Sequence, residues 1–123
     1  MAERNIVAEI KAERGFDTLP SFYCVLEPHP RLLAQFWDGL RVAMAPGQID
    51  AKTKEMIALG ISIALGARYA IDSHLAIARR LGMSDAEYEE ILLISVAFAQ
   101  TAAICAAFDP KYDPAEYRQN GPR

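Results

Sequence analysis

The chain has 123 residues, which suits one domain with a real hydrophobic core and is short for two. Apolar residues make up 52% of the sequence and alanine is abundant, so the composition favours an all-α fold of closely packed helices. The formal net charge is −3 and the basic residues are scattered along the chain, which argues against nucleic acid as the partner.

The two cysteines, Cys24 and Cys105, lie far apart in the sequence and form no CxxC pair. Their spacing signals neither a disulfide framework nor a zinc site, and it fits a reducing compartment. Residues 1–15 alternate charged and apolar side chains, without the apolar stretch and small-residue cleavage site of a signal peptide. We therefore expect a cytoplasmic protein.

In residues 2–14, apolar side chains recur at helical spacing among charged ones, which predicts a surface helix with one apolar stripe. Gly15 is expected to end this helix. Residues 16–30 contain three prolines and should form a loop with at most a short helix between Pro20 and Glu27. The loop carries the aromatic side chains Phe16, Phe22 and Tyr23, which we expect to pack over the mouth of a helical bundle.

The segment after Pro30 predicts a helix with a wide apolar face. That face consists of Leu32, Leu33, Phe36, Trp37, Leu40 and Met44. We interpret its leucines and the two aromatic residues as core. The Pro46-Gly47 pair ends the helix. Asp50 is suited to cap the next one, because its carboxylate can accept a free N–H group of the first turn. This helix carries no charge after Glu55 and runs to about residue 65.

Gly66 makes a turn into a helix over about residues 68–81, with Gly82 just past its end. Ser84 and Glu87 have the spacing of a capping box that opens a long helix to about residue 108. Residues 109–123 are polar and rich in proline, which predicts a tail. The expected architecture is five main helices in a single domain over residues 1–123, with a core at about 28–108.

Residues 91–108 form an uncharged stretch at the lower limit of membrane-spanning length. We do not interpret it as a span, because Ser95, Gln100 and Thr101 interrupt it and no basic cluster flanks it. A helix that is apolar on all sides can instead be buried in a bundle or in a subunit interface. Together with residues 56–67, this stretch holds more apolar surface than one small bundle hides, so we expect self-association.

The sequences KEMIALGISIALG, from Lys54, and SDAEYEEI, from Ser84, flank a helix with an HxxxAxxLG pattern. Five residues mark this order: Glu55, Tyr69, His74, Gly82 and Glu87. The pattern resembles the carboxymuconolactone decarboxylase family, which includes the alkylhydroperoxidase-D-type thiol peroxidases, and the resemblance covers about residues 28–108. It implies an all-helical fold and a trimer or hexamer with a pocket near the subunit contacts.

The redox branch of that family carries a Cys-x-x-Cys-x-x-x-His motif, with a glutamate twelve residues before the first cysteine as a proton relay. By this resemblance the histidine falls on His74 and the glutamate on Glu55, but the two cysteine positions fall on Ala67 and Ala70. A methyl group cannot become a thiolate or form a disulfide, so thiol peroxidase activity by the family's route should be absent.

Glu55 lies 11 residues before Gly66 and His74 lies 8 after it. In an antiparallel helix pair the two residues would differ in height by only ~4.5 Å at a rise of ~1.5 Å per residue. A carboxylate beside an imidazole fixes its tautomer and suits it to general acid–base catalysis. The candidate stabilisers of developing negative charge are Arg68, Tyr69, Tyr23 and Arg41.

These residues would suit a decarboxylase, another lyase or an isomerase acting on a small organic acid or lactone. The decarboxylase branch of the family performs such chemistry without a metal or an organic cofactor, so we expect neither. Two alternatives stay open. A buried histidine and glutamate can simply satisfy each other in a non-catalytic oligomeric domain. A thiol peroxidase could use Cys24 or Cys105, although burial is the expected state of both.

Other conspicuous residues are interpreted as structural. Phe98, like Trp37, is expected in the core. His29 lies between two prolines and is expected to be an exposed loop residue rather than a metal ligand. With two histidines and no cysteine pair, no structural metal site is expected. The expected partners are therefore a small-molecule substrate and further copies of the chain, not nucleic acid or a membrane.

Overall fold

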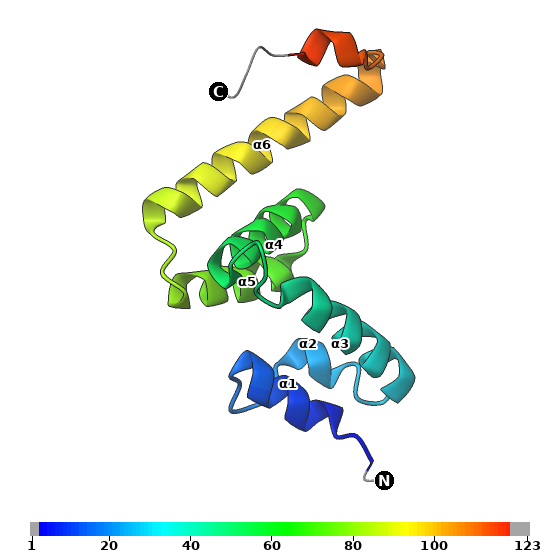
Figure 1. Ribbon diagram of the computed structural model, residues 1–123, viewed down its shortest axis with the longest axis vertical. Coiled ribbons are helices and arrows are strands. Elements are labelled where there is room, and N and C mark those ends of the chain that lie inside the picture. The colour runs from blue at the N-terminus through cyan, green and yellow to red at the C-terminus, as the bar shows by residue number, and fades with distance from the viewer. Residues whose placement is uncertain (1–2, 119–123) are drawn as a thin grey trace.

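The computed structural model describes residues 3–118, and this part of the chain is helical without strands (Figure 1). Its elements are α1 (Ile6–Arg14), α2 (Ser21–Cys24), α3 (Pro30–Met44), α4 (Ala51–Leu65), α5 (Arg68–Arg80), α6 (Asp85–Phe108) and the short 3-10 helix η1 (Pro114–Tyr117). The predicted all-α class is confirmed. The short helix expected after Pro20 is α2.

Local side chains explain where the helices begin. Asp50 accepts the Thr53 backbone N–H at 2.7 Å, which confirms it as the cap of α4. Ser84 and Glu87 form the predicted capping box, in which each side chain accepts the other residue's backbone N–H at 3.0 Å. Helix α1 begins at Ile6, later than the sequence predicted, because the Asn5 side chain caps it.

Glycines set two of the helix ends that matter for the site. Gly15 after α1 and Gly66 after α4 have φ angles of 73° and 68°, in the left-handed region that side chains rarely occupy. Gly66 folds α5 back along α4, as expected of the predicted turn. Gly15 turns the chain into the aromatic loop directly after Arg14, the last residue of α1.

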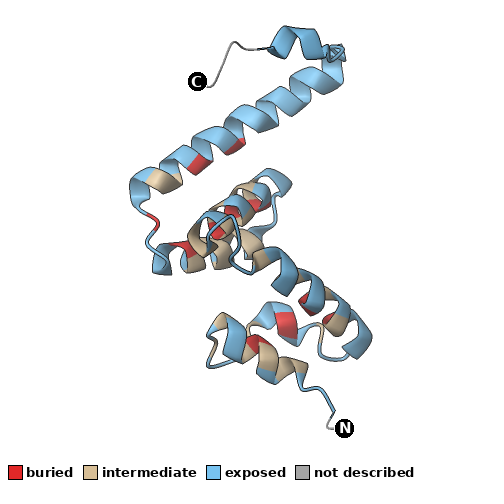
Figure 2. Cartoon of the chain, in the orientation of Figure 1, coloured by how far each residue is buried: buried red, intermediate tan, exposed pale blue. Residues whose placement is uncertain are grey.

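The buried side chains form two clusters (Figure 2). The first, in α1–α3, consists of Ile10, Tyr23, Leu33 and Trp37. The second lies between α4, α5, the following turn and the first half of α6, and it consists of Leu59, Ala78, Met83 and Ile91. Helix α4 packs against α5 and α6 and also contacts α3, so it joins the two clusters. The prediction that Trp37 is a core residue is confirmed, whereas Leu32 of the same predicted face is 50% exposed and is not a core residue.

The second half of α6 extends beyond both clusters (Figure 2). Beyond Ser95 its residues are exposed, including Phe98 at 66% and Phe108 at 79%. Phe98 is therefore not a core residue of this chain, contrary to the prediction, because α6 is longer than the α4–α5 hairpin that it packs on. Within residues 3–118, α6 is the one helix long and apolar enough to cross a membrane, and 11% of its most apolar window is buried.

Both cysteines are exposed, so the expected burial of Cys24 and Cys105 is wrong for the chain by itself. Cys105 lies on the second half of α6, where every residue after Ser95 is exposed. Cys24 is the last residue of α2, and its thiol donates a hydrogen bond to the Leu19 carbonyl at 3.4 Å. His29 is exposed before α3, as predicted.

The segment after α6 is only partly the predicted tail. Asp109 ends α6 in the left-handed conformation, and η1 follows with the Asp113 side chain as its cap. Tyr112 and Tyr117 stack with ring centroids 5.8 Å apart, and both rings are exposed. Residues 119–123 of the predicted tail lie outside the described residues.

Candidate functional site

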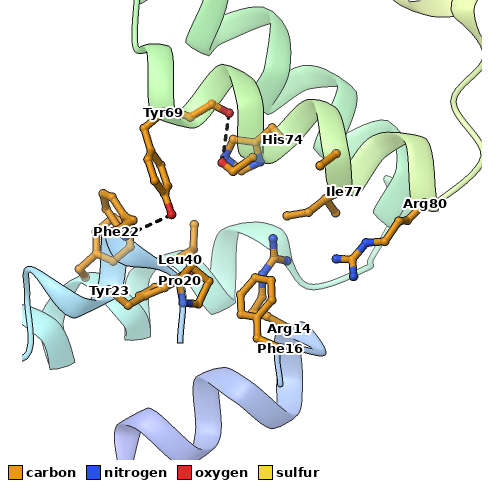
Figure 3. Close-up of a pocket in the computed structure, with 14 residues that line it drawn as sticks. Arg14, Phe16, Pro20, Phe22, Tyr23, Leu40, Tyr69, His74, Ile77 and Arg80 are labelled. Atoms are coloured by element: carbon orange, nitrogen blue, oxygen red, sulfur yellow. Dashed lines mark hydrogen bonds between the residues drawn. The ribbon is translucent and has the colours of Figure 1, made fainter. Parts of the chain in front are cut away.

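A cavity of about 600 Å³ lies between α5 and the loop–helix segment that joins α1 to α3 (Figure 3). Its lining residues are Arg14, Phe16, Pro20, Phe22, Tyr23, Phe36, Leu40, Tyr69, Ala70, Ser73, His74, Ala76, Ile77 and Arg80. The lining is mostly apolar, and a few polar groups converge on it, as is usual in small-molecule sites. The predicted aromatic loop forms one wall of this cavity.

Three charged or titratable side chains from three helices form a continuous chain beside the cavity. The carboxylate of Glu55 on α4 contacts His74 Nδ1 on α5 through Oε2, at 2.6 Å. Its other oxygen, Oε1, accepts a hydrogen bond from Arg14 Nη2 at the end of α1, at 2.9 Å. The predicted proximity of Glu55 and His74 is thus confirmed. The participation of Arg14 was not predicted.

Glu55 is almost completely buried, with 2% of its surface exposed. Burial acts to raise the pKa of its carboxyl group, but the hydrogen bonds from His74 and Arg14 and the charge of Arg14 outweigh it, so the pKa lies below its ordinary value. Glu55 is therefore the ionised acceptor in this contact. His74 Nδ1 must carry the proton, and Nε2 is the ring nitrogen that Glu55 leaves free.

Tyr69, from the first turn of α5, lies on the opposite side of the cavity from the arginines (Figure 3). Its hydroxyl oxygen accepts the Phe22 backbone N–H at 3.2 Å, which ties α5 to the aromatic loop. The hydroxyl proton of Tyr69 is not used in that bond and is available to a ligand. Tyr23 lines the same wall, and burial raises the pKa of its hydroxyl.

The structure brings together only some of the predicted site residues. His74, Tyr69 and Tyr23 line the cavity, with Glu55 directly behind His74. Two of the predicted charge stabilisers lie elsewhere. Arg68 is exposed and pairs with Asp72 one turn further along α5. Arg41 pairs with Glu13 and Glu9 and does not line the cavity either.

The lining arginines, Arg14 and Arg80, are the functional candidates that the sequence analysis missed. Arg80 lies six residues after His74, at the end of α5. Ser73, Ile77 and Arg80 have the i, i+4, i+7 spacing of one helix face, and His74 adjoins Ser73. This spacing could have indicated that Arg80 lies on the same side of α5 as His74. For Arg14 the sequence holds no such signal, because its contact with Glu55 spans 41 residues.

Ala67 and Ala70 occupy the start of α5, where the redox motif would carry its thiols. Ala70 lines the cavity and Ala67 is the residue before the first turn of the helix. Neither Cys24 nor Cys105 is a lining residue. In residues 3–118, no three histidine, cysteine, aspartate or glutamate side chains are grouped so that they could hold a metal ion.

A model of the carboxymuconolactone decarboxylase family matches residues 30–110. The chain belongs to this family. The match includes α3–α6, and therefore Glu55 and His74, whereas Arg14 and the aromatic loop precede it. The resemblance expected from the sequence is confirmed at the level of the family.

Among solved structures, the chain is similar to the crystal structure of the alkylhydroperoxidase AhpD core from Rhodospirillum rubrum ATCC 11170. The two share 34% sequence identity and superpose with a TM-score of 0.83, over 93% of this chain and 85% of the other. A search of curated proteins gives no match. The fold is thus that of the AhpD core.

Proposed function

We propose that this family member is a cofactor-independent proton-transfer enzyme, a decarboxylase or other lyase or an isomerase, acting on a small organic acid or lactone. The observation that carries the proposal is the position of His74, which lines a cavity while Glu55 holds its Nδ1. The free Nε2 would exchange a proton with the substrate, and the catalytic residues would be His74 and Glu55.

The geometry suits general base catalysis in two respects. The buried carboxylate keeps the ring in one tautomer, so Nε2 is a proton acceptor before reaction. The same negative charge stabilises the imidazolium that forms when Nε2 takes a proton from a carbon acid. Tyr69 and Tyr23 face the same space and would donate hydrogen bonds to the enolate oxygen that the substrate develops.

A thiol peroxidase is disfavoured as an alternative, because Ala67 and Ala70 carry no thiol and neither Cys24 nor Cys105 lines the cavity. A non-catalytic domain would need no cavity beside the buried pair, and the 600 Å³ cavity favours catalysis over that reading. The non-catalytic domain remains the alternative that the deuterium experiment tests.

We also propose that the chain works as a trimer or hexamer in the cytoplasm, without nucleic acid or a membrane as partner. The exposed apolar residues of α6 support self-association, because a single chain leaves them in water. They include Leu92, Leu93, Ile94, Val96, Phe98, Ile104 and Phe108. Light scattering at micromolar concentration tests this, and a monomer would contradict it.

The proton-transfer proposal can be tested before the natural substrate is known. Wild-type protein is incubated in D₂O with a panel of small carboxylic acids, keto acids and lactones, and deuterium incorporation at carbon is followed by NMR. We expect incorporation for at least one class of compound and its loss in His74→Ala. The matched control is His29→Ala, which removes the exposed histidine outside the cavity and should retain it.

Incorporation that persists at the wild-type rate in His74→Ala would contradict the proposed role of the histidine. If wild-type protein labels no compound of the panel, the non-catalytic alternative is favoured instead. Circular dichroism of each variant shows whether the fold is retained.

A further inference from the structure

The charged side chains in the cavity lining are all basic. Two arginines line it, Arg14 and Arg80, and none of the lining residues is an aspartate or glutamate. Arg14 is balanced by Glu55, at 2.9 Å. Over residues 3–118 the ion pairs include Arg79 with Asp85, but none involves Arg80. Among the residues that the structure describes, no ion pair therefore neutralises Arg80, and the cavity should attract an anion.

The two guanidinium groups lie on the same side of the cavity, across from the Tyr69 and Phe22 rings (Figure 3). Arg80 is exposed, which places it at the mouth. Arg14 is more enclosed, and its Nε–H is buried without an acceptor among the described residues. A buried donor without a partner is costly in a folded protein, and an anionic ligand at this end would supply negative charge to both groups.

The opposite wall is aromatic. Phe22 lies between Phe36 and Tyr69, with ring centroids at 5.0 Å and 6.2 Å, and Tyr23 packs edge-on against it at 5.3 Å. Leu40 continues this surface. Such a wall gains free energy by removing apolar ligand surface from water, and it offers few hydrogen bonds to a polyhydroxylated or multiply charged molecule.

We propose that the cavity binds a small apolar or aromatic monocarboxylate, whose carboxylate is held by Arg80 at the mouth while its apolar body lies against the aromatic wall. Arg80 is six residues beyond His74 on α5, so the two positions are separated by ~9 Å along the helix axis. The anchored carboxylate is thus a specificity group that stays on the molecule, so within the proposed function the inference favours an isomerase, or a lyase other than a decarboxylase. The placement of the reacting atom near His74 rests on the proposed function, whereas the binding of the carboxylate by Arg80 does not.

The test measures binding without turnover. Isothermal titration calorimetry compares 3-phenylpropionate with its neutral amide, 3-phenylpropionamide, on folded wild-type protein. The acid is expected to bind about tenfold or more tightly than the amide, as one charged hydrogen-bonded contact implies. Arg80→Gln should abolish this preference, and Arg80→Lys should retain part of it. The matched control is Arg79→Gln, which removes the neighbouring arginine that pairs with Asp85 outside the cavity and should retain the whole preference.

Three results would overturn the proposal: no binding of the acid to wild-type protein, equal affinities of acid and amide, or equal losses in Arg80→Gln and Arg79→Gln. Because no reaction is needed, the outcome is separate from that of the deuterium experiment. A preference that depends on Arg80 in a protein that labels no substrate would leave the binding inference standing and defeat the catalytic one.

Discussion

Replacing Arg14 with methionine removes one of the two groups that hold the buried carboxylate of Glu55. Methionine keeps an unbranched chain of similar length, so the change is mainly electrostatic. The Arg14 and Glu55 side chains are only 17% and 3% exposed, so water screens the pair little. Removing one partner of a buried ion pair costs ~3–5 kcal/mol when the other charge is left alone.

His74 remains on the second carboxylate oxygen, so the charge of Glu55 is not left alone. The free energy of unfolding should therefore fall by the contribution of one hydrogen bond to a charged group and part of the ion-pair energy, about 2–3 kcal/mol in total. For a chain of this length, each kcal/mol lowers the melting temperature by about 3–5 °C, so a decrease of about 6–15 °C is expected.

Urea unfolding at a fixed protein concentration measures the change, with circular dichroism and the fluorescence of Trp37 as probes. Trp37 is the sole tryptophan and is fully buried in the α1–α3 cluster, so it reports on the part of the fold that Arg14 joins to α4. Arg68→Met is the matched control. Its ion pair with Asp72 is exposed and screened by water, so its loss should leave the stability close to that of wild type.

A double-mutant cycle with Glu55→Gln separates the pair from other effects of each substitution. The coupling energy between Arg14 and Glu55 is expected to be about 1–2 kcal/mol, because the two side chains are in direct contact. A stability of Arg14→Met within about 0.5 kcal/mol of wild type, or a coupling energy near zero, would refute this reasoning.

Three further predictions concern stability. Ser84→Ala removes the cap of α6 and should cost about 1 kcal/mol by urea unfolding, with no change in binding at the cavity. Tyr69→Phe leaves the Phe22 N–H without its acceptor and should cost about 1 kcal/mol; no loss would mean that the contact is dispensable. The pKa of Glu55 is lower in the folded than in the unfolded state, so its ionised form stabilises the fold above its ordinary pKa of 4.5. The stability difference between wild type and Glu55→Gln should therefore shrink as pH falls below that value, and a difference that grows on acidification would contradict the assignment.

Local signals in the sequence predicted the fold well. Caps such as Asp50 and the Ser84–Glu87 box act within one helical turn. Gly66 marks a backbone conformation that few other residues adopt. Each of these features can therefore be predicted from a short segment of sequence. The same is true of the Glu55–His74 contact, because one short turn fixes the register of the two helices that carry it.

What the sequence could not predict depends on contacts distant along the chain. Arg14 reaches Glu55 only because α1 packs on α3 and α3 contacts α4, and no local pattern encodes that path. The exposure of Phe98 and Cys105 was missed for a related reason. An uncharged helix predicts burial, but its sequence does not indicate whether it packs against other helices of the same chain or against another copy of the chain.

The most direct test of the central claim is the tautomer of His74, measured from the ¹⁵N chemical shifts of its neutral imidazole ring. His29→Asn assigns the signals, since the chain has two histidines. A ring held by ionised Glu55 should carry its proton on Nδ1 and leave Nε2 as an unprotonated acceptor facing the substrate. A proton on Nε2 in the folded protein would contradict the proposed base.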